Sequence, residues 1–170
     1  MSKVYLYIAA TLDSYIASPD GSIDWLKGDL DYGYNEFIAN IDTVIMGRKT
    51  YEQVLTFGDY PYSRQKSFIL ASAGFRSSND SITIISEGFT DFAKNIAVTG
   101  GNIWIVGGAA TIQLFTELDL IDEYIIFTVP MLIGNGIPLF SPFKRQIDLD
   151  LVEAKRYDDG IVLTRYIRTI

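Results

Sequence analysis

Two adjacent glycines, Gly107 and Gly108, lie between an apolar run and a helical pattern. Because they carry no side chain, a phosphate group can approach the main chain closely at this point. The first turn of the following helix adds free N–H donors and a favourable dipole. The junction therefore predicts an anion site, and tight strand-to-helix packing is the alternative interpretation. Its residues are Val106, Gly107, Gly108, Ala109, Ala110 and Thr111.

A second junction carries two cations, Arg48 and Lys49, between Gly47 and Thr50. Positive side chains at the start of a helix oppose the helix dipole, which favours negative charge there. Their presence is explained if they bind an anion such as a pyrophosphate or a 2′-phosphate. The alternative is that both side chains simply extend into solvent.

The composition excludes several kinds of chemistry. The 170 residues include neither cysteine nor histidine, so we expect no metal site, and thiol nucleophiles, Ser-His-Asp triads and histidine bases are excluded. Acid–base chemistry must come from carboxylates, lysine, tyrosine, water or a cofactor. The net charge of −7 opposes a nucleic-acid partner, because binding to a phosphate backbone requires clustered Lys and Arg. The sequence shows no signal-peptide pattern and no apolar run near the ~20 residues of a membrane span, so we expect a cytoplasmic protein without a membrane partner.

Apolar runs and helical patterns alternate along the first two thirds of the chain. Runs without polar alternation predict strands buried on both faces, over Val4–Ala10, Asp42–Met46, Ser67–Leu70, Ile82–Ile85 and Ile103–Val106. Helices are predicted around Tyr34–Ile41 and over Thr50–Leu55, Thr90–Ala97 and Ala109–Leu118, with Thr90 as an N-cap. This alternation implies a mainly parallel sheet covered on both sides.

The last third of the sequence has a different pattern. Tyr124–Val129, Leu149–Lys155 and Ile161–Arg168 predict strands without intervening helices, and Asp158-Asp159-Gly160 predicts a turn between the last two. The predicted fold class is therefore α/β, with three α/β/α layers and a mostly parallel central sheet that ends in an antiparallel C-terminal hairpin. No linker, charge block or repeat divides the chain, so we expect residues 1–170 to form a single domain.

Several motifs together resemble the dihydrofolate reductase-like superfamily. Gly47-Arg48-Lys49-Thr50 follows an apolar strand, and Val106-Gly107-Gly108 comes about sixty residues later. Thr11–Ala17 is similar to the start of the mobile loop that covers the nicotinamide in that superfamily. Asp122–Thr128 is similar to a late strand that ends in a substrate-side threonine.

The chain also resembles the C-terminal reductase domain of the bifunctional riboflavin-biosynthesis deaminase–reductase. Leu12-Asp13, Ile16-Ala17 and Pro130–Gly136 have counterparts there. The combined resemblance covers nearly the whole chain and implies a dinucleotide cleft for NADPH, with NADH as the alternative.

The resemblance assigns roles to individual residues of the cleft. Ala9, Ile16 and Ala17 would line the nicotinamide; Gly107, Gly108 and Ala109 would meet the pyrophosphate; Arg48, Lys49 and Thr50 would hold the adenosine phosphates; Leu70 and Ser72 would flank the adenine ribose; Gly47, Val106, Ala110 and Thr111 complete the site. It also implies a cis peptide bond between the two glycines. Ala110 replaces a cation that is common in the family, so preference for NADPH rests on Arg48, Lys49, Ser72 and Arg76. Ser14 stands where related loops usually have glycine.

The substrate side is assigned to fewer residues. Trp25 and Tyr34 are expected to contact the substrate, and Thr128 is the substrate-side threonine. Counting back from Gly47 assigns the substrate-anchoring carboxylate to Asp31, whose alternative role is that of a helix N-cap. Asp29 and Glu36 compete for the role, and Asp13 either enters the pocket or anchors its own loop.

These residues predict an NADPH-dependent reductase that transfers hydride to a pteridine or pyrimidine-ribose type small molecule. A loop over Ile16–Trp25 would close the cleft and exclude water. One alternative is a catalytically weak dinucleotide-binding or regulatory module on the same fold, and another is a plain small-ligand α/β binding protein. Relatives of the riboflavin type commonly pair, so we expect a homodimer, with Tyr124–Val129 and the C-terminal hairpin as its surface.

Overall fold

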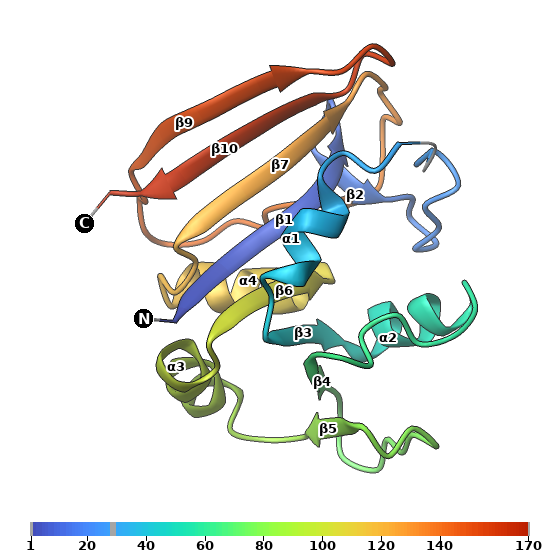
Figure 1. The fold of residues 1–170 in the computed structure, drawn as a ribbon, viewed down its shortest axis with the longest axis vertical. Coiled ribbons are helices and arrows are strands. Elements are labelled where there is room, and N and C mark those ends of the chain that lie inside the picture. The colour runs from blue at the N-terminus through green and yellow to red at the C-terminus, as the bar shows by residue number, and fades with distance from the viewer. Residues whose placement is uncertain (1, 28–29, 170) are drawn as a thin grey trace.

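A computed structural model describes residues 2–27 and 30–169 of the chain (Figure 1). Its strands are β1 (Lys3–Thr11), β2 (Tyr15–Ala17), β3 (Thr43–Gly47), β4 (Lys66–Leu70), β5 (Ile82–Ile85), β6 (Asn102–Gly107), β7 (Glu123–Val129), β8 (Ile137–Pro138), β9 (Leu149–Arg156) and β10 (Val162–Arg168). Eight of them form one sheet in the order β5-β4-β3-β6-β1-β7-β10-β9. Neighbours are parallel from β5 to β7, and β10 runs antiparallel to both β7 and β9. The predicted parallel sheet with an antiparallel C-terminal hairpin is confirmed.

Helices cover both faces of the sheet (Figure 1). They are α1 (Tyr34–Ala39), α2 (Arg48–Leu55), α3 (Phe89–Thr99) and α4 (Ala109–Glu117). Side chains of β1 alternate between the two faces. Leu6 belongs to the apolar core with α3 and α4, whereas Tyr7 stacks on Phe37 of α1, with ring centres 4.2 Å apart. The predicted three-layer architecture is confirmed. Within the described residues, no helix has the length and apolar character needed to cross a membrane.

Two helix starts differ from the prediction. α2 begins at Arg48, immediately after β3, rather than at Thr50. α3 begins at Phe89, so Thr90 is not its N-cap. Gly88 takes that position with φ of 63°, a left-handed conformation that glycine adopts at low cost and threonine does not. A threonine near a helix start was therefore a misleading signal.

A short two-stranded sheet, β2 with β8, joins the loop after β1 to the loop after β7. Asp13 anchors this connection. Its carboxylate accepts hydrogen bonds from the Thr11 hydroxyl at 2.6 Å and from the backbone N–H groups of Gly134 and Ile133 at 2.8 and 3.1 Å. The Thr11 hydroxyl, helped by those N–H groups, lowers the pKa of Asp13. Of the two roles proposed for Asp13, the structure supports loop anchoring.

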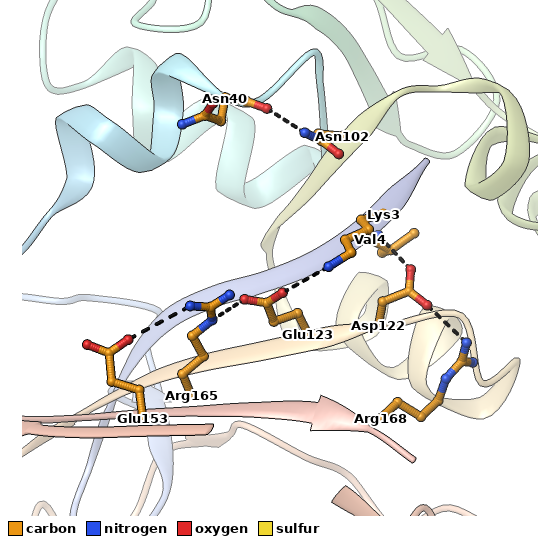
Figure 2. Close-up of polar contacts among 9 residues, drawn as sticks. All are labelled: Lys3, Val4, Asn40, Asn102, Asp122, Glu123, Glu153, Arg165 and Arg168. Carbon is orange, nitrogen blue, oxygen red and sulfur yellow. Dashed lines mark hydrogen bonds and ion pairs between the residues drawn. The ribbon is translucent and has the colours of Figure 1, made fainter. Parts of the chain in front are cut away.

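Charged side chains attach the C-terminal hairpin to the start of β1 (Figure 2). Glu123 on β7 is only 2% exposed; it accepts a hydrogen bond from Arg165 of β10, and its Oε2 lies 3.8 Å from Lys3 Nζ. The neighbouring Asp122 pairs with Arg168 at 2.9 Å. Because these partners come from β1, β7 and β10, they fix the position of the hairpin against the parallel part of the sheet.

The expected dimer surface needs a correction. Tyr124–Val129 forms most of β7, which lies between β1 and β10 and whose side chains are mostly buried. Both edges of this strand already pair within the chain, so it cannot extend the sheet into a second copy. The C-terminal hairpin remains the candidate surface for pairing with a second copy, because its outer strand β9 is exposed along its whole length.

Candidate active site

Two strand-to-helix junctions lie side by side at the carboxyl ends of β3 and β6, which pair in parallel. Gly47 is the N-cap of α2 and Gly108 is the N-cap of α4, and neither helix has a side-chain cap. The first N–H groups of a helix have no intrahelical partner. Two sets of such donors therefore open on the same edge of the sheet.

The glycines at these junctions leave a hollow that side chains would fill. A Cβ on Gly47 would lie 3.3 Å from Thr111 Oγ1, and a Cβ on Gly108 would lie 3.3 Å from Thr50 Oγ1. The peptide bond between Gly107 and Gly108 is cis, as the resemblance implies. A hollow that lacks bulky side chains and lies beside two helix N-termini can accommodate a diphosphate.

Arg48 forms a charged wall next to this hollow. Its Nε lies 2.8 Å from Glu52 Oε1, and its guanidinium lies 4.9 Å from the ring centre of Phe75. The ion pair and the ring together orient the cation without burying it. Arg76 donates a hydrogen bond to the Phe75 carbonyl. Of the four residues expected to select NADPH, it alone does not line the cavity.

One large cavity of about 1670 Å³ contains this hollow. Its volume exceeds the ~300–1,000 Å³ of an ordinary small-molecule pocket, so a dinucleotide and a second small molecule both have room. Apart from Arg76, the residues assigned above to the cofactor all line it: Ala9, Ile16, Ala17, Gly47, Arg48, Lys49, Thr50, Leu70, Ser72, Val106, Gly107, Gly108, Ala109, Ala110 and Thr111.

Asp31 lines the same cavity, but its carboxylate is engaged by the backbone. One oxygen accepts the N–H of Gly33 and the other accepts the N–H of Asn35, both at 3.1 Å. These bonds hold the turn that precedes α1, but the N-cap of the helix is Gly33, so the capping role considered for Asp31 is wrong. Of its rivals, Glu36 does not line the cavity, and Asp29 lies outside the described residues.

Thr128 and Trp25, two residues expected on the substrate side, do not line the cavity. Thr128 pairs with Ala10 and Phe127 pairs with Ala9, so it is Phe127 that shares the cavity face with Ala9. Trp25 instead packs into the apolar cluster around Phe127. Tyr34, the third residue assigned to the substrate, does line the cavity.

An aromatic wall, which sequence reasoning missed, lines part of the cavity. Tyr7, Tyr62, Trp104 and Phe127 belong to it together with Tyr34. Alternation along β1 was the available signal, because Tyr7 lies two residues before Ala9 and therefore on the same face. Tyr62 and Trp104 come from distant segments and carried no such signal.

The phenols in this wall stay protonated at neutral pH. Burial is the main cause that raises the pKa of Tyr7, Tyr34 and Tyr62, and for Tyr7 nearby Tyr157 and Asp31 raise it further. This wall of the cavity is therefore aromatic and carries no charge of its own. Such a wall can hold a planar ring by stacking and by hydroxyl hydrogen bonds.

Comparisons with known proteins find both uncharacterized relatives and relatives named for riboflavin biosynthesis. The RibD C-terminal domain pattern matches residues 96–163. The uncharacterized protein YwjB of Bacillus subtilis is 39% identical over 171 residues, which are 98% of each chain. A putative riboflavin biosynthesis protein from Shewanella sp. PV-4 is 29% identical and superposes with a TM-score of 0.87 over 99% of each chain. A Thermotoga maritima diaminohydroxyphosphoribosylaminopyrimidine deaminase/5-amino-6-(5-phosphoribosylamino)uracil reductase shares the fold at 16% identity, with a TM-score of 0.73 over 99% of this chain and 57% of that one.

Proposed function

The chain belongs to the RibD C-terminal domain family of the dihydrofolate reductase-like superfamily, and from this premise we propose that it is an NADPH-dependent reductase of a pteridine or pyrimidine-ribose type small molecule. One observation carries the proposal. Two glycine-capped helix starts open side by side into a cavity that also has an aromatic second compartment. A protein that binds only one small ligand has no need of both features.

The residues of the cavity divide into a cofactor end and a substrate end. The N–H groups after Gly47 and Gly108 suit a pyrophosphate, and the small side chain of Ala9 leaves room for a flat ring above β1. When bound, the reduced nicotinamide supplies hydride to the substrate. Arg48 and Lys49 support a preference for NADPH over NADH, because a 2′-phosphate adds negative charge next to them.

The remaining task of the chain is to orient the reacting groups and exclude water. Hydride transfer needs the donor and acceptor carbons within about 3–3.5 Å. Tyr34 and Phe127 form walls that hold a planar substrate against the cofactor end. The loop 18–25 contributes Asp20 and Gly21 to the lining, and we propose that it closes over the bound pair.

Titration and turnover measurements test this function. The purified protein is titrated with NADPH and NADH, and loss of NADPH absorbance is then followed with dihydrofolate and with an aminouracil ribose phosphate. Tighter binding of NADPH and turnover of either compound are the expected results. Binding without any turnover favours a regulatory module instead, and the lack of any dinucleotide binding overturns the proposal.

Pairing of two chains remains part of the proposal. Light scattering of the purified protein measures its mass in solution, and a value near twice the 19.0 kDa of one chain is expected.

A further inference from the structure

Among the described residues, the hydroxyl of Tyr7 has no protein partner in the aromatic wall, whereas those of Tyr34 and Tyr62 interact with each other. Tyr7 lines the cavity, and within residues 2–27 and 30–169 its phenolic oxygen takes part in none of the side-chain hydrogen bonds. By contrast, the hydroxyl of Tyr60, outside the cavity, donates to Ser67 at 2.8 Å, and that of Tyr51 bonds Ser77 at 2.6 Å. Buried and half-buried tyrosine hydroxyls usually find a protein partner. A hydroxyl that faces a cavity without one is available to a ligand.

The ring of Tyr7 is held firmly in one place. It stacks on Phe37 with ring centres 4.2 Å apart and interplanar angle 16°, and it meets Phe127 at 4.8 Å. Trp104 approaches its edge at 6.0 Å and also donates its indole N–H to the Tyr7 carbonyl at 3.0 Å. Side chains locked by packing are what a catalytic group requires, since a shift of about 1 Å in such a group can cost 100-fold in rate.

Tyr7 is also close to the proposed position of the nicotinamide. It precedes Ala9 by two residues on β1, so the two side chains share a face and their Cα atoms are roughly 6.6 Å apart. A substrate ring that lies over the nicotinamide beside Ala9 therefore extends toward the Tyr7 hydroxyl.

The carboxylates around the cavity are already used by the protein. Those of Asp20 and Asp31 accept backbone N–H groups, at 2.9 Å from Ser22 and at 3.1 Å from Gly33 and Asn35. Glu52 pairs with Arg48 and Glu117 accepts the side-chain amide of Gln113. Among the described lining residues, these are the acidic ones. The chain has no histidine, and the lysines of the lining are Lys27, which is exposed, and Lys49, which is assigned to the cofactor phosphates. In the aromatic wall, the neutral phenol of Tyr7 is therefore a proton donor that no other described group of the protein engages.

We propose that Tyr7 is a catalytic residue, whose hydroxyl bonds the nitrogen or oxygen of the reducible C=N or C=O group of the substrate and gives it a proton. This inference rests on the proposed reductase function. The acceptor carbon gains the hydride, the π electron pair moves to the heteroatom, and Tyr7 supplies the proton that completes the CH–NH or CH–OH product. The phenolate then regains a proton from water at the cavity mouth. One reduced dinucleotide and one proton are consumed for each bond reduced.

The chemistry of the phenol suits this role. Burial raises the pKa of Tyr7, with smaller contributions from Tyr157, Asp31 and Tyr34, so the hydroxyl is protonated throughout the neutral range. The heteroatom becomes strongly basic only as hydride arrives, because an alkoxide or amide anion is a stronger base than a phenolate. Tyr7 therefore stabilises charge as it develops and does not protonate the resting substrate.

Two matched variants isolate the hydroxyl. Tyr7→Phe keeps the ring and its stacking, and Tyr60→Phe removes a phenol oxygen outside the cavity. We expect kcat for the better of dihydrofolate and the aminouracil ribose phosphate to fall about 100- to 1,000-fold in Tyr7→Phe. The Kd for NADPH should be unchanged in both variants, and Tyr60→Phe should keep the kcat of the parent protein. If the parent protein turns over and Tyr7→Phe matches it within about threefold, the role of Tyr7 is refuted while the reductase function stands.

A binding measurement gives a readout that does not depend on turnover. In NMR spectra of protein labelled with ¹³C at the tyrosine ζ carbons, the chain's 11 tyrosines give separate signals. The signal of Tyr7 or Tyr60 is identified by its absence from the spectrum of the corresponding phenylalanine variant. Adding either compound to the NADP⁺-bound protein should shift the Tyr7 signal and leave that of Tyr60 in place. A bound compound that leaves the Tyr7 signal unmoved overturns the inference. If NADPH binds but neither compound turns over, the reductase function itself fails, and the role of Tyr7 fails with it.

Discussion

Replacing Gly108 with alanine, and then with valine, is expected to weaken NADPH binding while leaving the protein folded. Gly108 has φ of −83° and ψ of −155°, an extended conformation open to residues other than glycine. An added Cβ would meet Thr50 Oγ1 at 3.3 Å, and this hydroxyl is the end of a side chain that can turn aside. We therefore expect a stability loss of about 1 kcal/mol or less.

The effect on affinity should be much larger than the effect on stability. The new methyl group occupies the hollow between the starts of α2 and α4, where a diphosphate is proposed to meet backbone N–H groups. One hydrogen bond to a charged group contributes about 1.5–3 kcal/mol, and 1.4 kcal/mol is tenfold in Kd. Losing a single such bond should raise the Kd for NADPH about 10- to 100-fold. The increase should be larger for the valine variant than for the alanine variant.

Fluorescence titration with NADPH measures the Kd, and thermal unfolding reports the fold of each variant. Ala39→Val, at the exposed end of α1 and outside the cavity, controls for enlarging a small residue. We expect this control to bind NADPH as the parent protein does. A Gly108→Val protein with an unchanged melting temperature and an unchanged Kd would show that the diphosphate is not held at this junction.

Three further substitutions test the frame around the cavity. The pKa of Asp13 is lower in the folded protein than the usual 3.8, so its contribution to stability is present above that value and disappears as pH falls through the folded pKa. Denaturant unfolding should therefore show a destabilised Asp13→Asn protein at pH 7 and a vanishing difference in strong acid. Arg165→Met leaves the buried carboxylate of Glu123 with only Lys3 at 3.8 Å, and should cost about 3 kcal/mol of unfolding free energy. Ser14 has φ of 66°, so Ser14→Gly should stabilise the protein by about 0.5 kcal/mol, measured by thermal unfolding.

Local patterns were sufficient for the fold and for the two glycine junctions of the cavity, whereas residues such as Ala9 and Leu70 were assigned through the family resemblance. An apolar run such as Val4–Ala10 excludes a solvated strand face, and its alternation with helices leaves a covered parallel sheet as the consistent arrangement. Gly47 and Gly108 were recognisable for a similar reason. Each junction comes directly after a strand of one parallel sheet, so strand direction alone brings both to the same edge. Backbone direction is a local property, and the sequence encodes it well.

The substrate end depended on tertiary structure. Thr128 and Phe127 differ by one position, and only the pairing of β7 with β1 decides which of them faces the cavity, because a shift of one residue reverses every side chain of a strand. Asp31 was a plausible acid by spacing, but its oxygens are taken by backbone N–H groups that α1 presents to them. The aromatic rings that pack around Tyr7 come from α1, β6 and β7. Which polar group finds a partner, and which is left facing the cavity, is decided by contacts between distant segments, and no local pattern records them.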